Sequence, residues 1–308
     1  MDREWWKAVL AAVERASRRL PRPGRRRPRF ADRLVVAMYL WCVWHDRPLC
    51  WACDRCHYGA LLRPRKLPSV SQFTRRVKED HFQLLLRAVH DELGQRGLLT
   101  AEGYIDGKPL PVSPVSKDRD ARGGKVCGGF AKGYKLHAYV NEFGRIVVWS
   151  VTPLNVAEQS VALEMLAHLP PAAPGAVCLA DSNYDSAPLH KAAAVLAPGL
   201  RLVTPLRGQA KVDPLEGHHP VTLRQMGPDR RQLVAAWGEH PDLLRFVLKA
   251  RNAVERAFGT LTCTGGGLSG LPAWVRTLGR VRRWVGAKII LYNARLGARE
   301  NMRERAAA

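Results

Sequence analysis

The chain has 308 residues, of which 46% are hydrophobic, enough for a packed core in one large domain or two ordinary ones. Lys and Arg number 49 against 27 Asp and Glu, and the net charge of +22 indicates a polyanionic partner, nucleic acid before an anionic membrane surface. A membrane-spanning protein is excluded, because the longest apolar run, 34–44, is much shorter than the roughly 20 residues that cross a bilayer.

Cysteine usage indicates the cellular compartment. Seven cysteines, an odd number, are spread over a large chain, which is typical of reduced thiols and predicts a cytoplasmic protein. Cys50, Cys53, Cys56 and His57 lie close together, but a structural zinc site normally needs a second, separated pair of ligands. We interpret these cysteines as buried or unreactive thiols. Residues 1–20 are typical of an amphipathic helix rather than a signal peptide, since acidic residues flank their apolar part.

Residues 1–98 are expected to form a small helical domain. The Pro- and Arg-rich segment 18–30 cannot form a regular helix, and it is either a basic arm that follows DNA phosphates, through Arg25–Arg27, or a solvated linker. Apolar residues recur at helical spacing after residue 31, and Ser69 carries a second helix-start signal. The helix that follows is expected to end near Gly94 or Gly97.

The character of the sequence changes at residue 99. Strands are predicted at 103–107, 134–141, 146–152, 176–180 and 201–204, and helices at 158–169, 187–196 and 242–262. Residues 113–132 read as a loose, charged loop. Antiparallel strands followed by strand–helix alternation predict the α/β class, with a mixed sheet flanked by helices over residues 99–308.

Two aspartates, Asp106 and Asp181, each follow an apolar strand segment. Either one alone would be interpreted as a turn or helix-cap residue. On strands separated by a hairpin and a helix, the two can converge at one edge of the sheet, where α/β proteins place functional groups.

A third acid, Glu255, lies in the predicted helix 242–262. On a helical projection, Glu255 and Arg251 fall on or beside the apolar stripe and not opposite it, as a surface ion pair would. A glutamate that faces the interior needs a metal or an arginine partner. Three carboxylates without clustered His or Cys favour Mg²⁺ or Mn²⁺, and paired ions of this kind can cleave a phosphodiester.

Five motifs follow one another in this half of the chain: YIDGKPL from Tyr104, KGYKLH from Lys132, TPLNVAE from Thr152, LADSNYDS from Leu179 and RNAVERAFG from Arg251. Together they resemble the DDE transposases of bacterial insertion sequences, and within these the insertion sequence four-like superfamily. The catalytic domain of these transposases has the ribonuclease H-like fold. The resemblance implies that Asp106, Asp181 and Glu255 are catalytic and ligate two Mg²⁺ or Mn²⁺ ions. Arg251 matches the Arg of a Tyr-Arg-Glu-Lys signature, whereas Leu248 stands where that signature has Tyr and Thr262 where it has Lys.

The function implied by this resemblance is DNA transposition. The phosphodiester at the ends of an insertion sequence would be hydrolysed, and the freed 3′-hydroxyl would attack target DNA. The implied partners are double-stranded DNA, as terminal inverted repeats and as target, and a second copy of the chain in a homodimer or higher oligomer. The implied location is the bacterial cytoplasm, at the nucleoid, and the helices of residues 1–98 would recognise the repeats. Two alternatives stay open: a ribonuclease H-like, structure-specific nuclease, and a catalytically silent DNA-binding regulator derived from a transposase.

Three further features are predicted outside the acid triad. Lys135 and His137 share one face of a strand, which is either exposed or close to a phosphate. Asp185 is interpreted as a cap of the helix at 187–196. Residues 274–296 predict a helix with an apolar stripe and a cationic face of Arg276, Arg280, Arg283 and Lys288, and this face is expected to contact phosphate.

Overall fold

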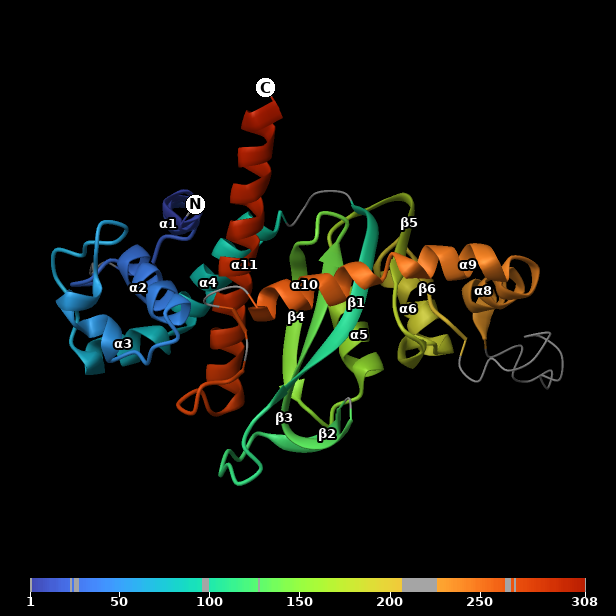
Figure 1. Cartoon of the computed structure of the whole chain (residues 1–308), viewed down its shortest axis with the longest axis horizontal. Coiled ribbons are helices and arrows are strands. Elements are labelled where there is room, and N and C mark those ends of the chain that lie inside the picture. The colour runs from blue at the N-terminus through green and yellow to red at the C-terminus, as the bar shows by residue number, and fades with distance from the viewer. Residues whose placement is uncertain are drawn as a thin grey trace. The chain divides into compact units, whose positions relative to one another are not determined.

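The computed structural model of the chain describes residues 2–22, 24, 28–95, 100–126, 128–206, 226–263, 267–268 and 270–307. The chain forms two compact units, Met1–Arg96 with Thr260–Ala308, and Gly97–Gly259 (Figure 1). The expected division into 1–98 and 99–308 differs from these units in the placement of residues 260–308, which group with the N-terminal helices. The expected basic arm, Arg25–Arg27, lies outside the described residues.

The first unit is helical. Its elements are α1 (Asp2–Arg19), α2 (Asp32–Trp44), the short η1 (Trp51–Cys53) and η2 (Arg55–His57), α3 (Val70–Val77), α4 (Asp80–Gly94) and α11 (Leu278–Ala307). The indole rings of Trp5 and Trp6 in α1 pack against Trp44 of α2, with ring centroids 4.7 and 5.5 Å apart. These rings bury large apolar surfaces and hold α1 against α2.

The helix boundaries in this unit follow local sequence signals. Ser69 begins α3 with a capping box: its hydroxyl accepts from the Gln72 N–H at 3.3 Å, and its own N–H donates to Gln72 Oε1 at 3.0 Å. Helix α4 ends at Gly94, and Gln95 follows in the left-handed conformation with φ of 55°. The predicted start at Ser69 and the predicted end near Gly94 are confirmed. The single helix expected between them is wrong, because the chain leaves the helix at Lys78 and begins α4 anew after Glu79.

Helix α11 completes the core of the first unit by packing against α1, α2 and α4. Val281, Val285 and Ile289 are buried, as its predicted apolar stripe requires. The placement of Lys288 on a cationic face is wrong. Lys288 is 1% exposed, and its Nζ lies 2.6 Å from Asp46 Oδ1, because α11 is covered on several sides and not on one stripe alone.

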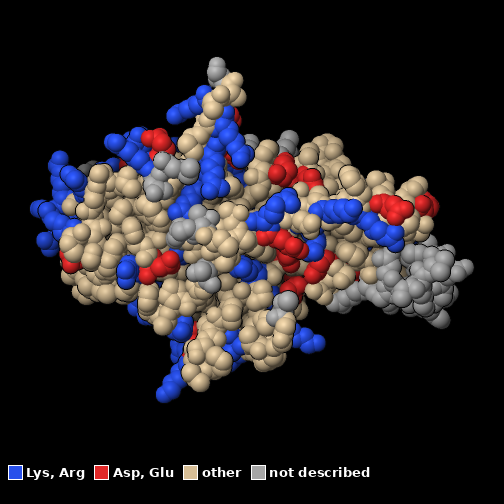
Figure 2. All heavy atoms as spheres, viewed as in Figure 1, with Lys and Arg blue, Asp and Glu red and all other residues tan. Residues whose placement is uncertain are grey.

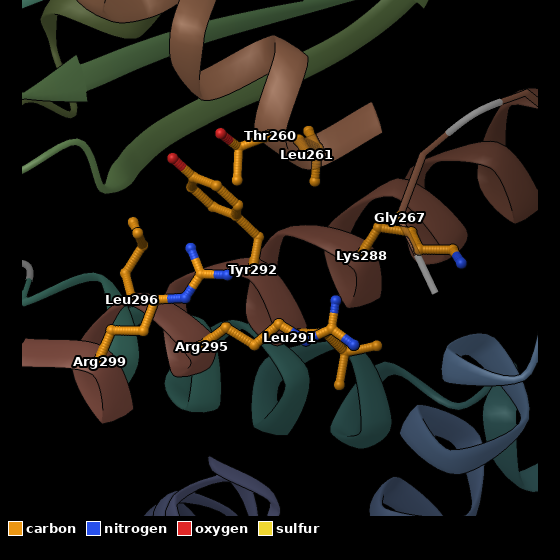
Figure 3. A pocket seen from close by; sticks show the side chains of 9 residues that line it. All are labelled: Thr260, Leu261, Gly267, Lys288, Leu291, Tyr292, Arg295, Leu296 and Arg299. Carbon is orange, nitrogen blue, oxygen red and sulfur yellow. The ribbon is translucent and has the colours of Figure 1, made fainter. Parts of the chain in front are cut away.

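A very small pocket lies beside α11 in this unit. Figure 3 shows its lining residues, which come from α11 and from the end of α10 (Asn252–Cys263), with Gly267 from the segment between the two helices. The cavity measures about 10 Å³, room for one water molecule at most. One of the lining residues, Arg295, stacks over the ring of Trp5 at 4.7 Å. We therefore interpret this pocket as a packing feature of the helical unit.

The second unit is built on a mixed, six-stranded sheet of order β2-β3-β1-β5-β6, with β4 also paired to β3 (Figure 1). The strands are β1 (Thr100–Pro111), β2 (Arg122–Val126), β3 (Gly129–Asn141), β4 (Ile146–Pro153), β5 (Ala172–Leu179) and β6 (Arg201–Val203). β3 is antiparallel to both of its neighbours β1 and β4, whereas β5 runs parallel to β1 and β6 runs parallel to β5. This is the mixed sheet predicted for a ribonuclease H-like domain, and the predicted fold class is confirmed.

Strand β2 lies in the segment that was expected to be a loose loop. It pairs with the start of β3, from Arg122↔Gly133 to Val126↔Gly129. Glycine makes this pairing possible, since a Cβ on Gly124 would lie 2.7 Å from the Leu154 carbonyl oxygen, and one on Gly133 would lie 2.4 Å from that of Leu110. The expectation of a loop over this part of 113–132 is therefore wrong.

Helices pack against the sheet through two apolar clusters. α5 (Glu158–Leu166) and α6 (Ala187–Leu196) share one apolar core with Ile105 of β1 and with Cys178 and Ala180 at β5. α8 (Gly227–Glu239) and α9 (Pro241–Lys249) form a smaller cluster around Trp237, whose Nε1 donates to the Thr204 carbonyl at 2.9 Å. Among the described helices, none combines the length and the apolar character that a membrane span requires.

Candidate active site

The register of the sheet places Asp106 and Asp181 next to each other. Tyr104 of β1 is the parallel partner of Leu179 of β5, and each aspartate lies two residues beyond its member of this pair. Side chains alternate along a strand, and Ile105 and Ala180 point into the core under α5 and α6. Asp106 and Asp181 therefore share the opposite face of the sheet. This register explains why Asp106 and Asp181 lie close together, as predicted from the sequence.

The sequence context predicted that the strand ends at Asp106, and this prediction is wrong. β1 continues to Pro111 along β3, whereas its pairing with β5 stops at Tyr104. The Asp106 side chain is 19% exposed, and burial raises the pKa of its carboxyl group to about 6. The Gly107 N–H, at 2.7 Å from Oδ1, and Arg251 oppose this rise, whereas the negative charges of Asp181 and Glu158 contribute to it. Asp106 is thus the electrostatically perturbed acid of the site.

Asp181 is the N-cap of the short helix η3 (Ser182–Tyr184). Its Oδ1 accepts from the Asn183 N–H at 2.8 Å, and its Oδ2 accepts from the Asn183 side-chain amide at 3.1 Å. The backbone of this turn is held in addition by Gln159, whose amide donates to the Asn183 carbonyl at 2.6 Å. These contacts fix the orientation of the Asp181 carboxylate.

Glu255 is brought to the site through Arg251. The Arg251 Nη1 lies 3.9 Å from Asp106 Oδ2, and its Nη2 lies 3.2 Å from Glu255 Oε1. In Figure 1, α10 passes in front of β1, on the side of the sheet away from α5. One guanidinium thus bridges the first and third acids of the predicted triad.

The predicted burial of Glu255 is wrong. Its side chain is 57% exposed, because the expected continuous helix 242–262 is divided into α9 and α10, with Ala250 and Arg251 between them. The break resets the helical phase, so the apolar stripe of one helix does not continue into the other. Leu244 and Leu248 pack around Trp237, whereas Val254 and Phe258 are buried from α10.

Sequence reasoning missed Glu158 and its pairing with Lys135. The Lys135 Nζ donates to Glu158 Oε1 at 2.6 Å, and both side chains are largely buried. Gly107 allows this approach, since a Cβ there would lie 3.0 Å from Glu158 Oε1. Both residues stand within two of the quoted motifs, KGYKLH and TPLNVAE, which was the only signal available.

Tyr184 adds a buried hydroxyl to the site. Its side chain is 1% exposed, and in the described part of the chain its hydroxyl has no hydrogen-bond partner. Burial raises the pKa of this phenol well above its ordinary value, and the charges of Glu158, Asp106 and Asp181 contribute. The phenol therefore stays neutral next to the acids.

Two neighbouring predictions are corrected. His137 is not on an exposed face: it is 1% exposed, its Nε2 lies 3.0 Å from Thr152 Oγ1, and burial, followed by the charge of Lys135, lowers its pKa to about 4. Asp185 does not cap α6, whose N-cap is Ser186. The Asp185 carboxylate instead binds the Arg230 guanidinium through both oxygens, at 2.8 and 2.9 Å.

The donor set suits a hard divalent cation. The acids of the site offer only carboxylate oxygens, and Asp181 and Glu158 place negative charge close to the largely buried Asp106, charge that a cation would compensate. In the described part of the chain, however, the only group of three or more metal-type ligands with atoms within 4.8 Å of one another is Asp54, Cys56 and His57. The carboxylate oxygens of Asp106, Asp181 and Glu255 are spaced more widely than this limit. The Arg251 guanidinium lies between Asp106 and Glu255.

Comparisons with known proteins were made for the whole chain. Residues 101–293 match the family model described as the transposase DDE domain. Among solved structures, the chain is similar to the piggyBac transposase in a cryo-EM structure of its synaptic complex with hairpin DNA, with a TM-score of 0.49 and 10% identity. That similarity covers 97% of this chain and 74% of the other. A search of curated proteins finds no significant match.

Proposed function

Because the chain belongs to the family of transposases with a DDE domain, we propose that it is an insertion-sequence transposase that cleaves DNA at the ends of its element and joins them to target DNA. The observation that carries this proposal is the register-matched pair of Asp106 and Asp181, with the pKa of Asp106 raised to about 6. Its substrates are double-stranded terminal repeats and target DNA, in the bacterial cytoplasm, and a homodimer or higher oligomer brings the two ends together.

The proposed metal ligands are Asp106, Asp181 and Glu255, and the proposed ions are two Mg²⁺ or Mn²⁺. When bound, such ions activate a water or a 3′-hydroxyl and stabilise the leaving oxygen of the phosphodiester. Neighbouring residues orient these carboxylates and balance the negative charge around them. Asn183 orients the Asp181 carboxylate, and Lys135 neutralises Glu158 beside Asp106. Arg251 keeps Glu255 close to Asp106, and its planar guanidinium is suited to a scissile phosphate.

The charge of the molecule supports DNA as the substrate. Figure 2 shows basic side chains spread widely over the helical unit, whereas the acidic side chains of the second unit on this face lie near β1 and α10 and over α8 and α9. The net charge of +22 supplies a field that attracts the phosphate backbone, and the local acids are suited to metal binding at the reaction site.

The test is an assay with a labelled duplex that carries the end sequence found next to the coding region. The full-length protein with Mg²⁺ or Mn²⁺ should nick this duplex and join it to a second DNA. Ca²⁺ should support binding with little cleavage, because its coordination is larger and looser. Cleavage without joining would favour the structure-specific nuclease, and binding with neither reaction would favour the silent regulator.

A further inference from the structure

A cavity of about 230 Å³ opens in the helical unit, apart from the acids of the second unit. Its wall is formed by the turn after α2, by the end of α3 and by the first turns of α11 with the segment before it. We call it the Arg–Trp cavity, after the six residues that characterise it: Arg47, Lys78, Trp274, Arg280, Arg283 and Trp284.

The Arg–Trp cavity carries positive charge without a counter-charge. None of the described residues that line it is acidic, and none of its four cationic side chains forms an ion pair with a described residue. Arg283 is half-buried, and burial together with the repulsion of Arg280 lowers its pKa. Buried charges in proteins are normally paired, so the half-buried Arg283, with the exposed Arg280 beside it and no acidic residue in the described lining, indicates an anionic ligand.

Two tryptophans give the cavity aromatic walls. The Trp274 side chain is 43% exposed, an uncommon state for the largest apolar side chain. Trp284 is 4% exposed, and its indole N–H has no hydrogen-bond partner among the residues that the structure describes. A buried indole N–H usually finds an acceptor, so the Trp284 N–H is an unsatisfied donor on a residue that lines the cavity.

The size of the cavity selects among anionic ligands. A volume of about 230 Å³ is below the range of roughly 300–1,000 Å³ for sites that hold drug-sized ligands, and a duplex cannot enter it. A single base with its phosphate is small, flat and anionic. A cationic groove with an aromatic stacking platform is the combination that binds single-stranded nucleic acid.

We propose that the Arg–Trp cavity binds one unpaired nucleotide of DNA, with its phosphate against Arg280 and Arg283 and its base stacked on Trp274. This proposal rests on DNA being the substrate, but it does not depend on the acid triad. It assigns the helical unit a site for a base that has left the duplex, in addition to any contact with paired DNA.

The test uses the full-length protein in EDTA at physiological salt, so that no cleavage takes place. Two probes are compared by fluorescence anisotropy: a labelled hexamer of thymidylate and a labelled duplex of random sequence. Trp274→Ala and Arg283→Gln should each weaken hexamer binding about ten-fold or more and duplex binding by less than about three-fold. Arg87→Gln and Phe143→Ala remove an exposed arginine and an exposed aromatic ring outside the cavity, and both should bind like wild type.

The proposal is overturned if Trp274→Ala binds the hexamer like wild type. It is also overturned if Arg87→Gln weakens hexamer binding as much as Arg283→Gln does, or if both probes are weakened equally, since general attraction to phosphates would then explain the result. Thermal unfolding identifies an Arg283 variant that fails to fold, and the partly exposed Trp274 then decides the test. Asp106→Asn should bind the hexamer normally. A wild type that binds through Trp274 but does not cleave would contradict the proposed function alone.

Discussion

The Arg251 guanidinium contacts two of the proposed catalytic acids at once, Asp106 and Glu255. A lysine ammonium keeps the charge but is a point donor on a flexible chain, so it cannot hold both carboxylates in one plane. We therefore expect Arg251→Lys to lower the rate of strand cleavage by about ten-fold or more, an effect of about 1.4 kcal/mol on the barrier. The measurement is the single-turnover cleavage rate of end DNA with saturating protein.

A matched control for Arg251 lies on the preceding helix. Arg245 pairs with Asp242 on the surface of α9, where both side chains are well exposed. Arg245→Lys should leave the cleavage rate unchanged, because surface ion pairs contribute little. Full activity of Arg251→Lys would reduce Arg251 to an ordinary helix ion pair of the same kind.

His137 gives the stability of the protein a defined pH dependence. Its folded-state pKa of about 4 lies below the ordinary value of 6.5, so the unfolded chain binds the proton first as pH falls. Stability is therefore fully present above pH 6.5 and is lost as the pH falls toward 4, by up to about 3 kcal/mol. Urea unfolding of wild type and His137→Gln at pH 7 and at pH 4 measures this loss, and the variant should lose less.

The exposed His240 is the control for this titration, since His240→Gln should unfold with the wild-type pH dependence. Other acids also titrate over this range, so the informative quantity is the difference between each variant and wild type. Equal losses in wild type and His137→Gln would mean that His137 carries no pH-dependent stability.

At the scale of elements, the contact of Asp185 with Arg230 joins the start of α6 to α8. The Asp185 side chain is fully buried, and Arg230 binds both of its oxygens. Arg230→Ala would remove the guanidinium that binds both oxygens of this buried carboxylate, and we expect it to destabilise the second unit by about 3–5 kcal/mol. Hydrogen exchange of the amides in α8, together with urea unfolding, measures the effect.

The exposed pair of Lys7 and Glu4 on α1 is the comparison for this buried pair. Lys7→Ala should change the free energy of unfolding by less than about 1 kcal/mol. A loss for Arg230→Ala no greater than that for Lys7→Ala would show that α8 is held mainly by the apolar cluster around Trp237.

The sequence predicted those parts of the fold that local pattern determines. β1, β3, β4, β5 and β6, the Ser69 capping box and the end of α4 all carry turn, cap or alternation signals within a few residues. The division between α9 and α10 carries no Gly or Pro signal, and the exposure of Glu255 depends on that division. The contact of Glu158 with Lys135 depends on how a helix start meets β3, which is a tertiary relation. Strand β2 escaped prediction because its glycines are usual in loops.

At the scale of the whole molecule, the first unit draws on both ends of the chain. Residues 1–98 alone lack α11, whose Val281, Val285 and Ile289 are buried in this unit. We therefore expect the fragment 1–98 to be poorly folded and the addition of a peptide covering 260–308 to increase its helicity and its unfolding temperature. Circular dichroism of the fragment with and without the peptide tests this. A fragment 1–98 that unfolds cooperatively without the peptide would contradict it.

The most direct test of the central claim is the cleavage of labelled end DNA by the Asp106→Asn, Asp181→Asn and Glu255→Gln variants, each compared with wild type in Mg²⁺. These changes keep the shape of each side chain and remove its charge, and Asp242→Asn, at an exposed acid of α9, is the matched control. The account predicts that each of the three variants folds, binds end DNA without metal and fails to cleave it, while the control cleaves like wild type. Cleavage at the wild-type rate by Asp106→Asn would contradict the proposed metal site.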